Sequence, residues 1–454
     1  MERGFADLFK LPGSELFGIM MKKTRVLMFG WEFPPHITGG LGTACHGLTG
    51  GLSESGQTEV IFVVPKIFGD EKPENVKLLG ANKVAVSKKE VEFFENSVKM
   101  EVVEIDSPLV PYLSEEEFWT LKSKKYTKQT RFIQTNKGYE VDFQGGYSGG
   151  LFDEIKKYAL VAEVIAREQR FDVIHAHDWL TFPAAIAAAK ISGKPLVVHV
   201  HATEFDRTGE NVNTHIYSIE REGMENADHI IAVSGLTKKT IVEKYGISAS
   251  RVSVVYNAVE PIEGSSPLKS GRIVKDKIIT FLGRITFQKG PEYFIEAAAL
   301  VLRKMRNVRF VMAGSGDLLD TMVLRVAELG IADRFHFTGF LSNDDVHQLL
   351  KMTDVFVMPS VSEPFGIVPL EAMQFNVPVI ISHQSGVSEI IEHAIKIDFW
   401  DTLAMADAIY GLLNYNALAR HFKSEGKQEV DSLEWTHAAR QVAGIYRMLL
   451  NLNS

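Results

Sequence analysis

The segment DVFVMPSVSEPFGIVPLEAM, residues 354–373, decides the fold of this chain. Its opening part is mostly apolar, which predicts a buried strand over 354–360. Pro364 disfavours helix at the preceding residue, so we place Glu363 in a loop and Glu371 inside the helix that follows. In an open α/β sheet, ligands bind beyond the carboxyl ends of the strands. We therefore expect both carboxylates to face a ligand, in preference to forming a solvated pair on one helix face.

The same alternation of apolar runs and helical segments continues on both sides of this segment. Runs that predict strands lie at 24–30, 58–65, 171–179, 195–203, 228–234 and 251–257, and later at 277–283, 307–314, 333–339 and 377–382. Strands at this spacing, with helices between them, argue for parallel sheets covered on both faces. The expected fold class is therefore α/β, with two Rossmann-like domains facing a central cleft.

The length of 454 residues exceeds the roughly 250–300 residues at which one core stops growing, so we expect two domains. The segment EPIEGSSPLKSGR, residues 260–272, is rich in Pro, Gly and Ser and reads as the linker. The expected division is a disordered leader at 1–21, a first domain at 22–262 with an insertion at 66–150, a second domain at 273–431, and a C-terminal helix at 432–454 that returns to the first domain.

Composition excludes several classes of protein. Lys and Arg total 49 against 57 Asp and Glu, a net charge of −8, which argues against a general nucleic-acid binder. The single cysteine, Cys45, allows no intrachain disulfide, so we expect a cytoplasmic protein. No apolar run approaches the roughly 18 residues that a transmembrane helix needs. Residues 1–20 lack the pattern of a signal peptide and read as a disordered leader or an over-extended gene start.

The segment WEFPPHITGGLG, residues 31–42, follows the first strand and opens a helix. Gly39 and Gly40 would let backbone N–H groups approach a phosphate at the helix N-terminus, although a simple tight turn is the alternative. A dinucleotide dehydrogenase is disfavoured, because its G-x-G-x-x-G frame would end at Cys45 here, and the loop after the strand is too long.

The second half offers cations and small residues at corresponding strand ends. In FLGRITFQKG, residues 281–290, Arg284 and Lys289 lie on the loop after a strand, where two cations can grip a diphosphate. Exposed basic residues are often only solvated, so this pair is ambiguous alone. Gly314 and Gly316 follow the next strand and permit close approach of the backbone to a ligand.

Histidines follow two neighbouring strands of the first half. HAHDW, residues 175–179, places His177 and Asp178 past a strand end, and HVH, residues 199–201, ends the next strand, so three histidines could cluster. A zinc site needs further ligands in a tetrahedral arrangement, so we expect no metal. Together, the Gly loop, the basic pair and the acid pair describe a cleft for a molecule with a diphosphate and a polyhydroxy group.

These motifs resemble those of a known family. E-P-F-G-x-x-x-L-E-A-M at 363–373, G-R-x-x-x-x-K-G at 283–290 and P-x-x-x-G-G-L at 35–41 are similar to the motifs of retaining nucleotide-sugar glycosyltransferases of the GT-B fold, the group 1 family that includes bacterial glycogen synthases. The resemblance covers the chain from about residue 22. HAHDW at 175–179 is most similar to the glycogen and starch synthase branch.

The resemblance implies roles for matching residues of the second half. Glu371 matches the glutamate that binds the ribose hydroxyls of the donor, and Glu363 matches the one that faces the donor sugar. Arg284 and Lys289 match the pair that neutralises the diphosphate leaving group. The loop whose backbone amides contact sugar and phosphate corresponds to Phe365, Gly366 and Ile367.

In the first half, Gly39 and Gly40 match the loop beside the phosphates, and His177 matches the histidine near the hydroxyls of the donor sugar. One departure is Ile37, where bacterial glycogen synthases usually carry Lys. A phosphate contact is then missing or supplied elsewhere.

The resemblance implies a retaining transfer of a hexose, glucose being favoured, from ADP-glucose or UDP-glucose to an α-glucan, with no cofactor and no metal. Three alternatives stay open: a related transferase for surface polysaccharide or lipid-linked sugar, a nucleotide-sugar epimerase on the same fold, and a non-catalytic glycan-binding protein. A glycan-binding protein has no need of a diphosphate grip, which argues against the last.

Overall fold

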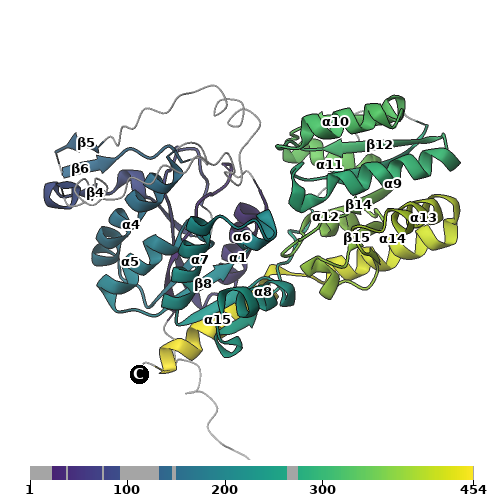
Figure 1. Ribbon diagram of the computed structural model, residues 1–454. Helices are drawn as coiled ribbons and strands as arrows, with labels where there is room; N and C mark the ends of the chain where they lie inside the picture. The colour runs from purple at the N-terminus through teal and green to yellow at the C-terminus, as the bar shows by residue number, and fades with distance from the viewer. Residues whose placement is uncertain are drawn as a thin grey trace, which may run out of the picture.

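The computed structural model describes residues 23–36, 39–73, 76–92, 132–136, 138–145, 150–262 and 275–452. The chain forms two lobes, each built on a sheet of parallel strands with helices on both faces (Figure 1). The predicted fold class, mixed α/β with parallel sheets in two domains, is confirmed. The expected leader at 1–21 lies outside the described residues, as does most of the expected linker at 260–272.

The sheet of the first lobe has the strand order β10-β9-β8-β7-β1-β2-β3. Its strands are β1 (Thr24–Phe29), β2 (Thr58–Val64), β3 (Lys77–Gly80), β7 (Val173–His177), β8 (Leu196–Val200), β9 (His229–Ala232) and β10 (Val252–Val254). The helices described in this lobe are α1 (Gly40–Glu54), α4 (Leu151–Glu168), α5 (Phe182–Ser192), α6 (Glu204–Thr208), α7 (Thr214–Asn226) and α8 (Gly235–Tyr245).

The central strand β1 shows why its sequence reads as a continuous apolar run. Leu27 and Phe29 point to one face of the sheet and join the core under α4 and α5, whereas Val26 and Met28 point to the other face and pack beneath α1. Alternate side chains of a strand face opposite sides, and a parallel sheet covered on both faces must bury both sets.

The sheet of the second lobe has the order β13-β12-β11-β14-β15-β16. Its strands are β11 (Lys277–Leu282), β12 (Val308–Ala313), β13 (Phe335–Gly339), β14 (Val355–Met358), β15 (Val379–Ser382) and β16 (Ile395–Ile397). The described helices are α9 (Pro291–Lys304), α10 (Leu319–Glu328), α11 (Asn343–Met352), α12 (Val368–Gln374), α13 (Thr402–Asn414) and α14 (Asn416–Asp431), with the short 3₁₀ helix η3 (Phe287–Lys289) after β11. The edge strand β16 was not predicted, because its sequence IKI is short.

The region expected as an insertion, 66–150, divides between two sheets. Its first strand, β3, pairs in parallel with β2 and so extends the main sheet of the first lobe. The strands β4 (Ala85–Val86), β5 (Phe132–Thr135) and β6 (Gly138–Val141) form a separate antiparallel sheet. Residues 93–131 of this region lie outside the described part of the chain.

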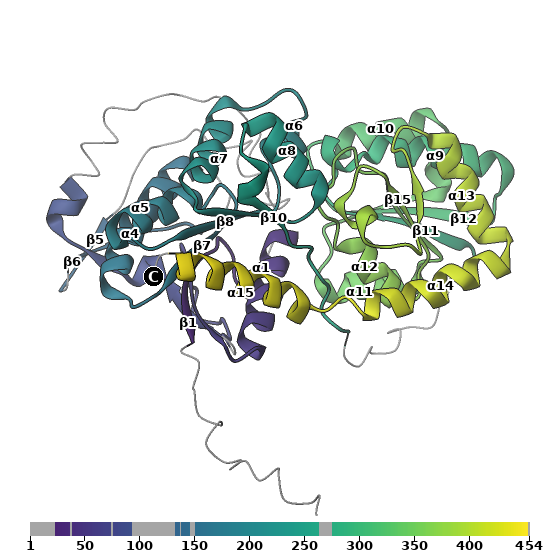
Figure 2. The ribbon, with the colours of Figure 1, turned by 90° about the horizontal axis from the view of Figure 1, so that it is seen from below.

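The last helix, α15 (Trp435–Leu452), leaves the second lobe and packs against α1 of the first (Figure 2). A Cβ atom at Gly47 would lie 2.2 Å from the Trp435 ring, and one at Gly51 would lie 2.7 Å from the Trp435 carbonyl oxygen. These two glycines on one face of α1 therefore allow the close contact between the helices. Among the described residues, no helix is both long and apolar enough to cross a membrane.

Candidate functional site

The predicted donor-binding residues of the second half gather where the strand order of its sheet reverses. β11 pairs with β12 on one side and with β14 on the other, so the loops after β11 and β14 diverge to form a topological switch point. Open α/β sheets bind ligands at such a point. Arg284 and Lys289 follow β11, and Glu363 follows β14. The structure thus brings the basic pair and one member of the acid pair to a single sheet edge.

Lys289 and Glu363 form an ion pair at this switch point. The Lys289 ammonium donates to Oε2 of Glu363, and Ser360 Oγ donates to the same oxygen at 3.2 Å. The side chain of Lys289 is 21% exposed and that of Glu363 is 9% exposed. Glu363 itself lies in a loop, where its N–H donates to the Gln384 carbonyl at 2.9 Å, as its position before Pro364 predicts.

Arg284 lies on the same loop, and its Nη2 donates to Gln288 Oε1 at 3.1 Å. The loop after β12 supports this loop through Gly314 and Gly316. Gly314 has a φ of +131°, and a Cβ atom there would lie 1.9 Å from the Gly283 carbonyl oxygen. The small residues that we interpreted as leaving room for a ligand therefore also leave room for the neighbouring loop, which fixes the position of Arg284.

The loop before α12 offers backbone groups rather than side chains. The Phe365 ring is buried among apolar neighbours, and the Val387 N–H donates to the Phe365 carbonyl at 2.7 Å. Gly366 has a φ of +101°, in the left-handed region that favours glycine. Ile367 is the N-cap of α12, so this loop ends where the first N–H groups of a helix lack intrahelical partners.

Glu371 lies in the first turn of α12, inside the helix that follows the loop of Glu363, as predicted. Glu371 is half-buried. Burial raises the pKa of the Glu371 carboxyl to about 7. A carboxyl group with a raised pKa in the first turn after this loop is a candidate for accepting hydrogen bonds from a bound polar molecule.

The first lobe has a matching switch point between β1 and β7, because β2 and β3 lie on one side of β1 while β7 to β10 lie on the other. Gly39 and Gly40 follow β1 and open α1. A Cβ atom at Gly40 would meet nothing within 4 Å, so the start of α1 is open. The departure at Ile37 lies outside the described residues.

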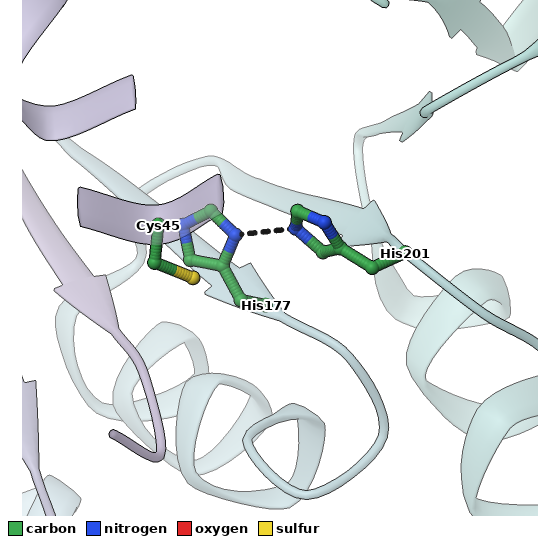
Figure 3. Close-up of side chains that lie close together, drawn as sticks. All are labelled: Cys45, His177 and His201. Carbon is green, nitrogen blue, oxygen red and sulfur yellow. Dashed lines mark hydrogen bonds between the residues drawn. The ribbon is translucent and has the colours of Figure 1, made fainter. Parts of the chain in front are cut away.

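His177 ends β7 on the other side of this switch point and is fully buried. Its Nδ1 forms a hydrogen bond of 2.9 Å with Nε2 of His201 (Figure 3). Burial lowers the pKa of His177 well below its ordinary value and lowers that of His201 to about 3, so both rings are neutral at pH 7. A neutral imidazole can both donate and accept a hydrogen bond, which suits contact with a hydroxyl group.

Asp178 holds the ends of β7 and β8 together. Its Oδ1 accepts from the N–H groups of His201 at 2.6 Å and of Ala202 at 3.3 Å. Its φ of +58° is left-handed, a conformation that Asp tolerates better than most residues. Burial raises the pKa of the Asp178 carboxyl to about 7.

The histidine cluster is larger than predicted, with four members instead of three. His175 stacks on His177 with ring centroids 4.5 Å apart, and His199 stacks on His201 at 4.3 Å. The signal was present in the sequence, because residues two apart in a strand share a face. What the sequence could not supply is the register that sets His177 beside His199, or the hydrogen bond of 2.5 Å from His175 Nδ1 to Tyr446 of α15.

Two contacts tie the lobes together close to these groups. Ser362 Oγ, next to Glu363, donates to Asp206 Oδ1 of α6 at 2.6 Å. Glu389 of the second lobe accepts from the N–H groups of Gly235 and Leu236, at the start of α8, at 2.7 Å each. Sequence reasoning missed both contacts, because they join residues more than 150 positions apart.

Comparison with known protein families gives two matches. The family model described as Glycosyl transferases group 1 matches residues 266–429, and the one described as Glycosyltransferase Family 4 matches residues 140–262. The first match contains Arg284, Lys289, Glu363 and Glu371, and the second contains His177.

Curated relatives cover most of the chain. An uncharacterized glycosyltransferase of Methanocaldococcus jannaschii is 27% identical over 94% of this chain and 99% of its own length. The glycogen synthase of Mycobacterium tuberculosis is 25% identical, covering 93% of this chain and 94% of its own. The alpha-maltose-1-phosphate synthase of Mycolicibacterium smegmatis is 30% identical over 61% of this chain and 78% of its own length.

Among solved structures, the sucrose-phosphate synthase of Thermosynechococcus elongatus superimposes with a TM-score of 0.65 at 18% identity, covering 95% of this chain and all of that one. At that identity the likeness shows the GT-B fold alone. The family matches and the curated relatives go further, and the chain belongs to the group 1 glycosyltransferases.

Proposed function

We propose that this glycosyltransferase moves a glucosyl group from ADP-glucose or UDP-glucose to an α-glucan acceptor, with retention of anomeric configuration and without a metal ion. The observation that carries the proposal is the ion pair of Lys289 and Glu363, with Arg284 on the same loop, at the switch point of the second sheet. The cations Lys289 and Arg284 contact the diphosphate of a nucleotide bound in the crevice, and the Glu363 carboxylate contacts the sugar attached to that diphosphate.

The chemistry needs charge stabilisation at the leaving group. The bond between the anomeric carbon and the diphosphate oxygen breaks, and negative charge grows on the diphosphate. Arg284 and Lys289 are held in place before the reaction, which is the arrangement that lowers the energy of a charged transition state. The acceptor hydroxyl attacks the same face of the sugar and gives its proton to the departing phosphate oxygen.

Binding of the donor exchanges partners within the ion pair. Lys289 donates to Glu363, and the diphosphate of a donor offers the ammonium group a stronger anion. Glu363 then keeps the hydrogen bond from Ser360 and turns its remaining acceptor capacity to the hydroxyl groups of the sugar. The ion pair thus holds both side chains ready until the donor arrives.

His177 supplies the polar contact from the first lobe. Its ring is neutral and hydrogen-bonded to His201, so a sugar hydroxyl can use the second ring nitrogen. The backbone of the loop at 365–367 and the open start of α1 at Gly39 and Gly40 approach the phosphates. Glu371 accepts hydrogen bonds from the ribose hydroxyls.

Metal independence follows from the same groups. Glycosyl transfer from a nucleotide donor requires positive charge at the diphosphate, and two side-chain cations on one loop provide it. A divalent ion would have to compete with Arg284 and Lys289 for the same oxygens. We therefore assign the charge stabilisation that a metal ion would supply to these two residues, which act as charged hydrogen-bond donors.

The acceptor is argued from the relatives and the histidine motif. A glycogen synthase matches nearly the whole chain, and another relative is named for the synthesis of a sugar phosphate, alpha-maltose-1-phosphate. Since HAHDW at 175–179 is similar to the glycogen synthase branch, we favour a glucan over a phosphorylated sugar.

A nucleotide-release assay tests the proposal. The purified chain is mixed with ADP-, UDP- and GDP-sugars, each alone, with glycogen, and with glucose 1-phosphate. Release from ADP-glucose or UDP-glucose that glycogen stimulates supports glucan synthesis. Release that only glucose 1-phosphate stimulates keeps the transferase and replaces the acceptor. Formation of an epimerised sugar without acceptor, or no release from any donor, contradicts the proposal.

A further inference from the structure

A thiol faces the histidine pair at the switch point of the first lobe. Cys45 lies in the second turn of α1, His177 ends β7, and His201 follows β8, and the three side chains lie close together (Figure 3). One potential ligand atom from each, the Cys45 sulfur and one ring nitrogen of each histidine, lies within 4.8 Å of the others. Three separate elements of the fold therefore converge on one point with three metal-binding side chains.

The polar atoms around this point are short of partners. Within the described part of the chain, Nε2 of His177 has no hydrogen-bond partner although the residue is fully buried. Both ring nitrogens of the adjacent His199 are also without partners among the described residues, and this side chain is 2% exposed. Unpaired buried nitrogens are costly, so the protein alone leaves the ring cluster beside Cys45 unsatisfied; the ion proposed below binds the two ring nitrogens that face each other next to these unpaired ones.

We propose that Cys45, His177 and His201 form an exchangeable site for a borderline-soft divalent cation of the Zn²⁺ type. One thiolate and two imidazoles are a ligand set that Zn²⁺ prefers over Mg²⁺ or Ca²⁺. The ion takes the place of the hydrogen bond between His177 and His201: the ring that donates in that bond moves its proton to its other ring nitrogen, so both imidazoles bind as neutral ligands, and the thiol releases its own proton to solvent. Because His201 alone of the three is partly exposed, the ion enters, and keeps an open fourth position, on the His201 side.

The two histidines need only small movements to bind the ion. The two hydrogen-bonded ring nitrogens lie 2.9 Å apart. Two nitrogens bound to a tetrahedral Zn²⁺ at about 2.0–2.1 Å each are separated by roughly 3.3 Å, so the rings need to part by only a few tenths of an ångström. A site with three protein ligands and one open position is typical of an ion that can react or exchange, whereas structural zinc sites are closed by four.

A competing group of ligands is weaker. His175, His177 and His199 also lie within 4.8 Å of one another, but all three are buried and none supplies a thiolate. His175 Nδ1 is moreover occupied by Tyr446. The Cys45 group has the softer ligand and the more open side, so we place the ion there.

Occupancy of this site has a consequence that rests on the proposed function. A neutral His177 ring that ligates the ion through Nδ1 carries its proton on Nε2, so this nitrogen can no longer accept a hydrogen bond from a hydroxyl of the donor sugar. A bound cation should therefore inhibit glycosyl transfer in competition with the donor. The site is then inhibitory, which is compatible with a reaction that needs no metal.

The first test is binding of Co²⁺ and Zn²⁺ to the full chain after treatment with a chelator. Cys45 is the single cysteine of the chain, so any thiolate-to-cobalt charge-transfer band must come from it. We expect such a band at one ion per chain, and its displacement by Zn²⁺. Cys45→Ala and, as a second variant in case the first does not fold, Cys45→Ser should lose the band and bind Zn²⁺ at least tenfold more weakly.

His36→Asn is the matched control. His36 belongs to a third group of possible ligands among the described residues, with Asp70 and Glu71, and this group is more exposed. The variant should bind Co²⁺ as the unmodified chain does. No charge-transfer band in the unmodified chain, or Zn²⁺ affinity that Cys45→Ala leaves unchanged, would overturn the site.

The second test separates the metal site from the proposed function. Zn²⁺ should raise the apparent KM for the donor in the nucleotide-release assay, and Cys45→Ala should keep its basal rate and lose this inhibition. A charge-transfer band with no inhibition overturns the overlap of ion and donor. A charge-transfer band with no transfer activity from any donor overturns the proposed function and leaves the metal site standing.

Discussion

Replacing Lys289 by Met tests whether the ion pair with Glu363 serves catalysis or only the fold. Met keeps most of the apolar stem and removes the charge. Removing one preorganised group that stabilises a developing anion lowers kcat by about 10²–10³, which is about 2.7–4 kcal/mol. We expect a decrease of this size in nucleotide release at saturating donor.

The same change leaves Glu363 nearly buried without its cation. Breaking a buried ion pair by removing one partner costs about 3–5 kcal/mol. Ser360 still donates to Glu363 and Lys289 is 21% exposed, so the cost should fall below this range. We expect about 2 kcal/mol, which lowers the melting temperature of a lobe of this size by about 4–8 °C.

A second substitution separates the two effects. Glu363→Gln in the Lys289→Met background removes the uncompensated carboxylate, so the double variant should regain most of the lost melting temperature. Its turnover should stay at least about 100-fold below that of the unmodified chain, because the cation at the leaving group is still missing. Lys304→Met is the control, since Lys304 pairs with Asp407 on the surface of the same lobe, where both side chains are about 60% exposed.

Two results would refute this reasoning. Turnover of Lys289→Met within about threefold of the unmodified chain would remove Lys289 from the leaving-group site. Recovery of turnover together with melting temperature in the double variant would show that the ion pair is structural only. Circular dichroism melts and initial-rate measurements on the four proteins decide between these outcomes.

Four further predictions follow from the same geometry. Activity should survive EDTA, and its complete loss would contradict the assignment of charge stabilisation to side-chain cations. Because the pKa of Glu371 is raised to about 7, the folded chain holds a proton that the unfolded chain loses above about pH 4.3, so stability should fall as pH rises from about 5 to 8. Thermal unfolding of the Glu371→Gln variant should lack this part of the pH dependence. Calorimetry on the same variant should show weaker nucleotide binding, and an unchanged affinity would contradict the contact with the ribose. Gly366→Ala places a side chain on a residue with a φ of +101°, which should lower the free energy of unfolding by about 1–3 kcal/mol and disturb the loop at the donor site. Melting temperature and donor KM measure the two effects. Gly56→Ala is the control, since Gly56 has a φ of +65° and a Cβ atom there would meet nothing within 4 Å. Ser362→Ala removes the 2.6 Å hydrogen bond to Asp206 between the lobes. The loss of about 1.5 kcal/mol of hydrogen-bond energy should raise the donor KM about tenfold, with little change in melting temperature. An unchanged KM would show that this contact does not contribute to donor binding.

Local sequence predicted the elements better than their boundaries. The apolar run before Pro364 gave the strand β14, and the loop at Glu363 follows from the proline. The exact start of α12 was not predicted: Gly366 has a positive φ, and the helix begins only at Val368. The short edge strand β16 carries too few apolar residues to be recognised, and it exists because β15 offers it an edge to pair with.

The position of each motif in the sequence predicted which strand end each candidate site residue follows. Because the strands of each sheet are parallel, these residues then lie at one edge of their sheet. The contact of Lys289 with Glu363 joins residues 74 positions apart, and the sequence indicated only that both lie near the same edge. The alternation HAH and HVH fixes which histidines share a face within each strand. Their merger into one stack depends on the register of β7 against β8, which no local pattern specifies.

The sequence by itself determined the class of fold, the identity of the charged and glycine-rich loops, and the membership of a glycosyltransferase family, because each depends on residue order over a few positions. Only the tertiary structure decided that Lys289 is held by Glu363, that Ser362 meets Asp206 across the lobes, and that Cys45 reaches the histidines His177 and His201. These contacts depend on how sheets, helices and lobes pack against each other. Packing is a property of the whole chain, so residues far apart in sequence come into contact only when the apolar faces of all the sheets and helices are packed together.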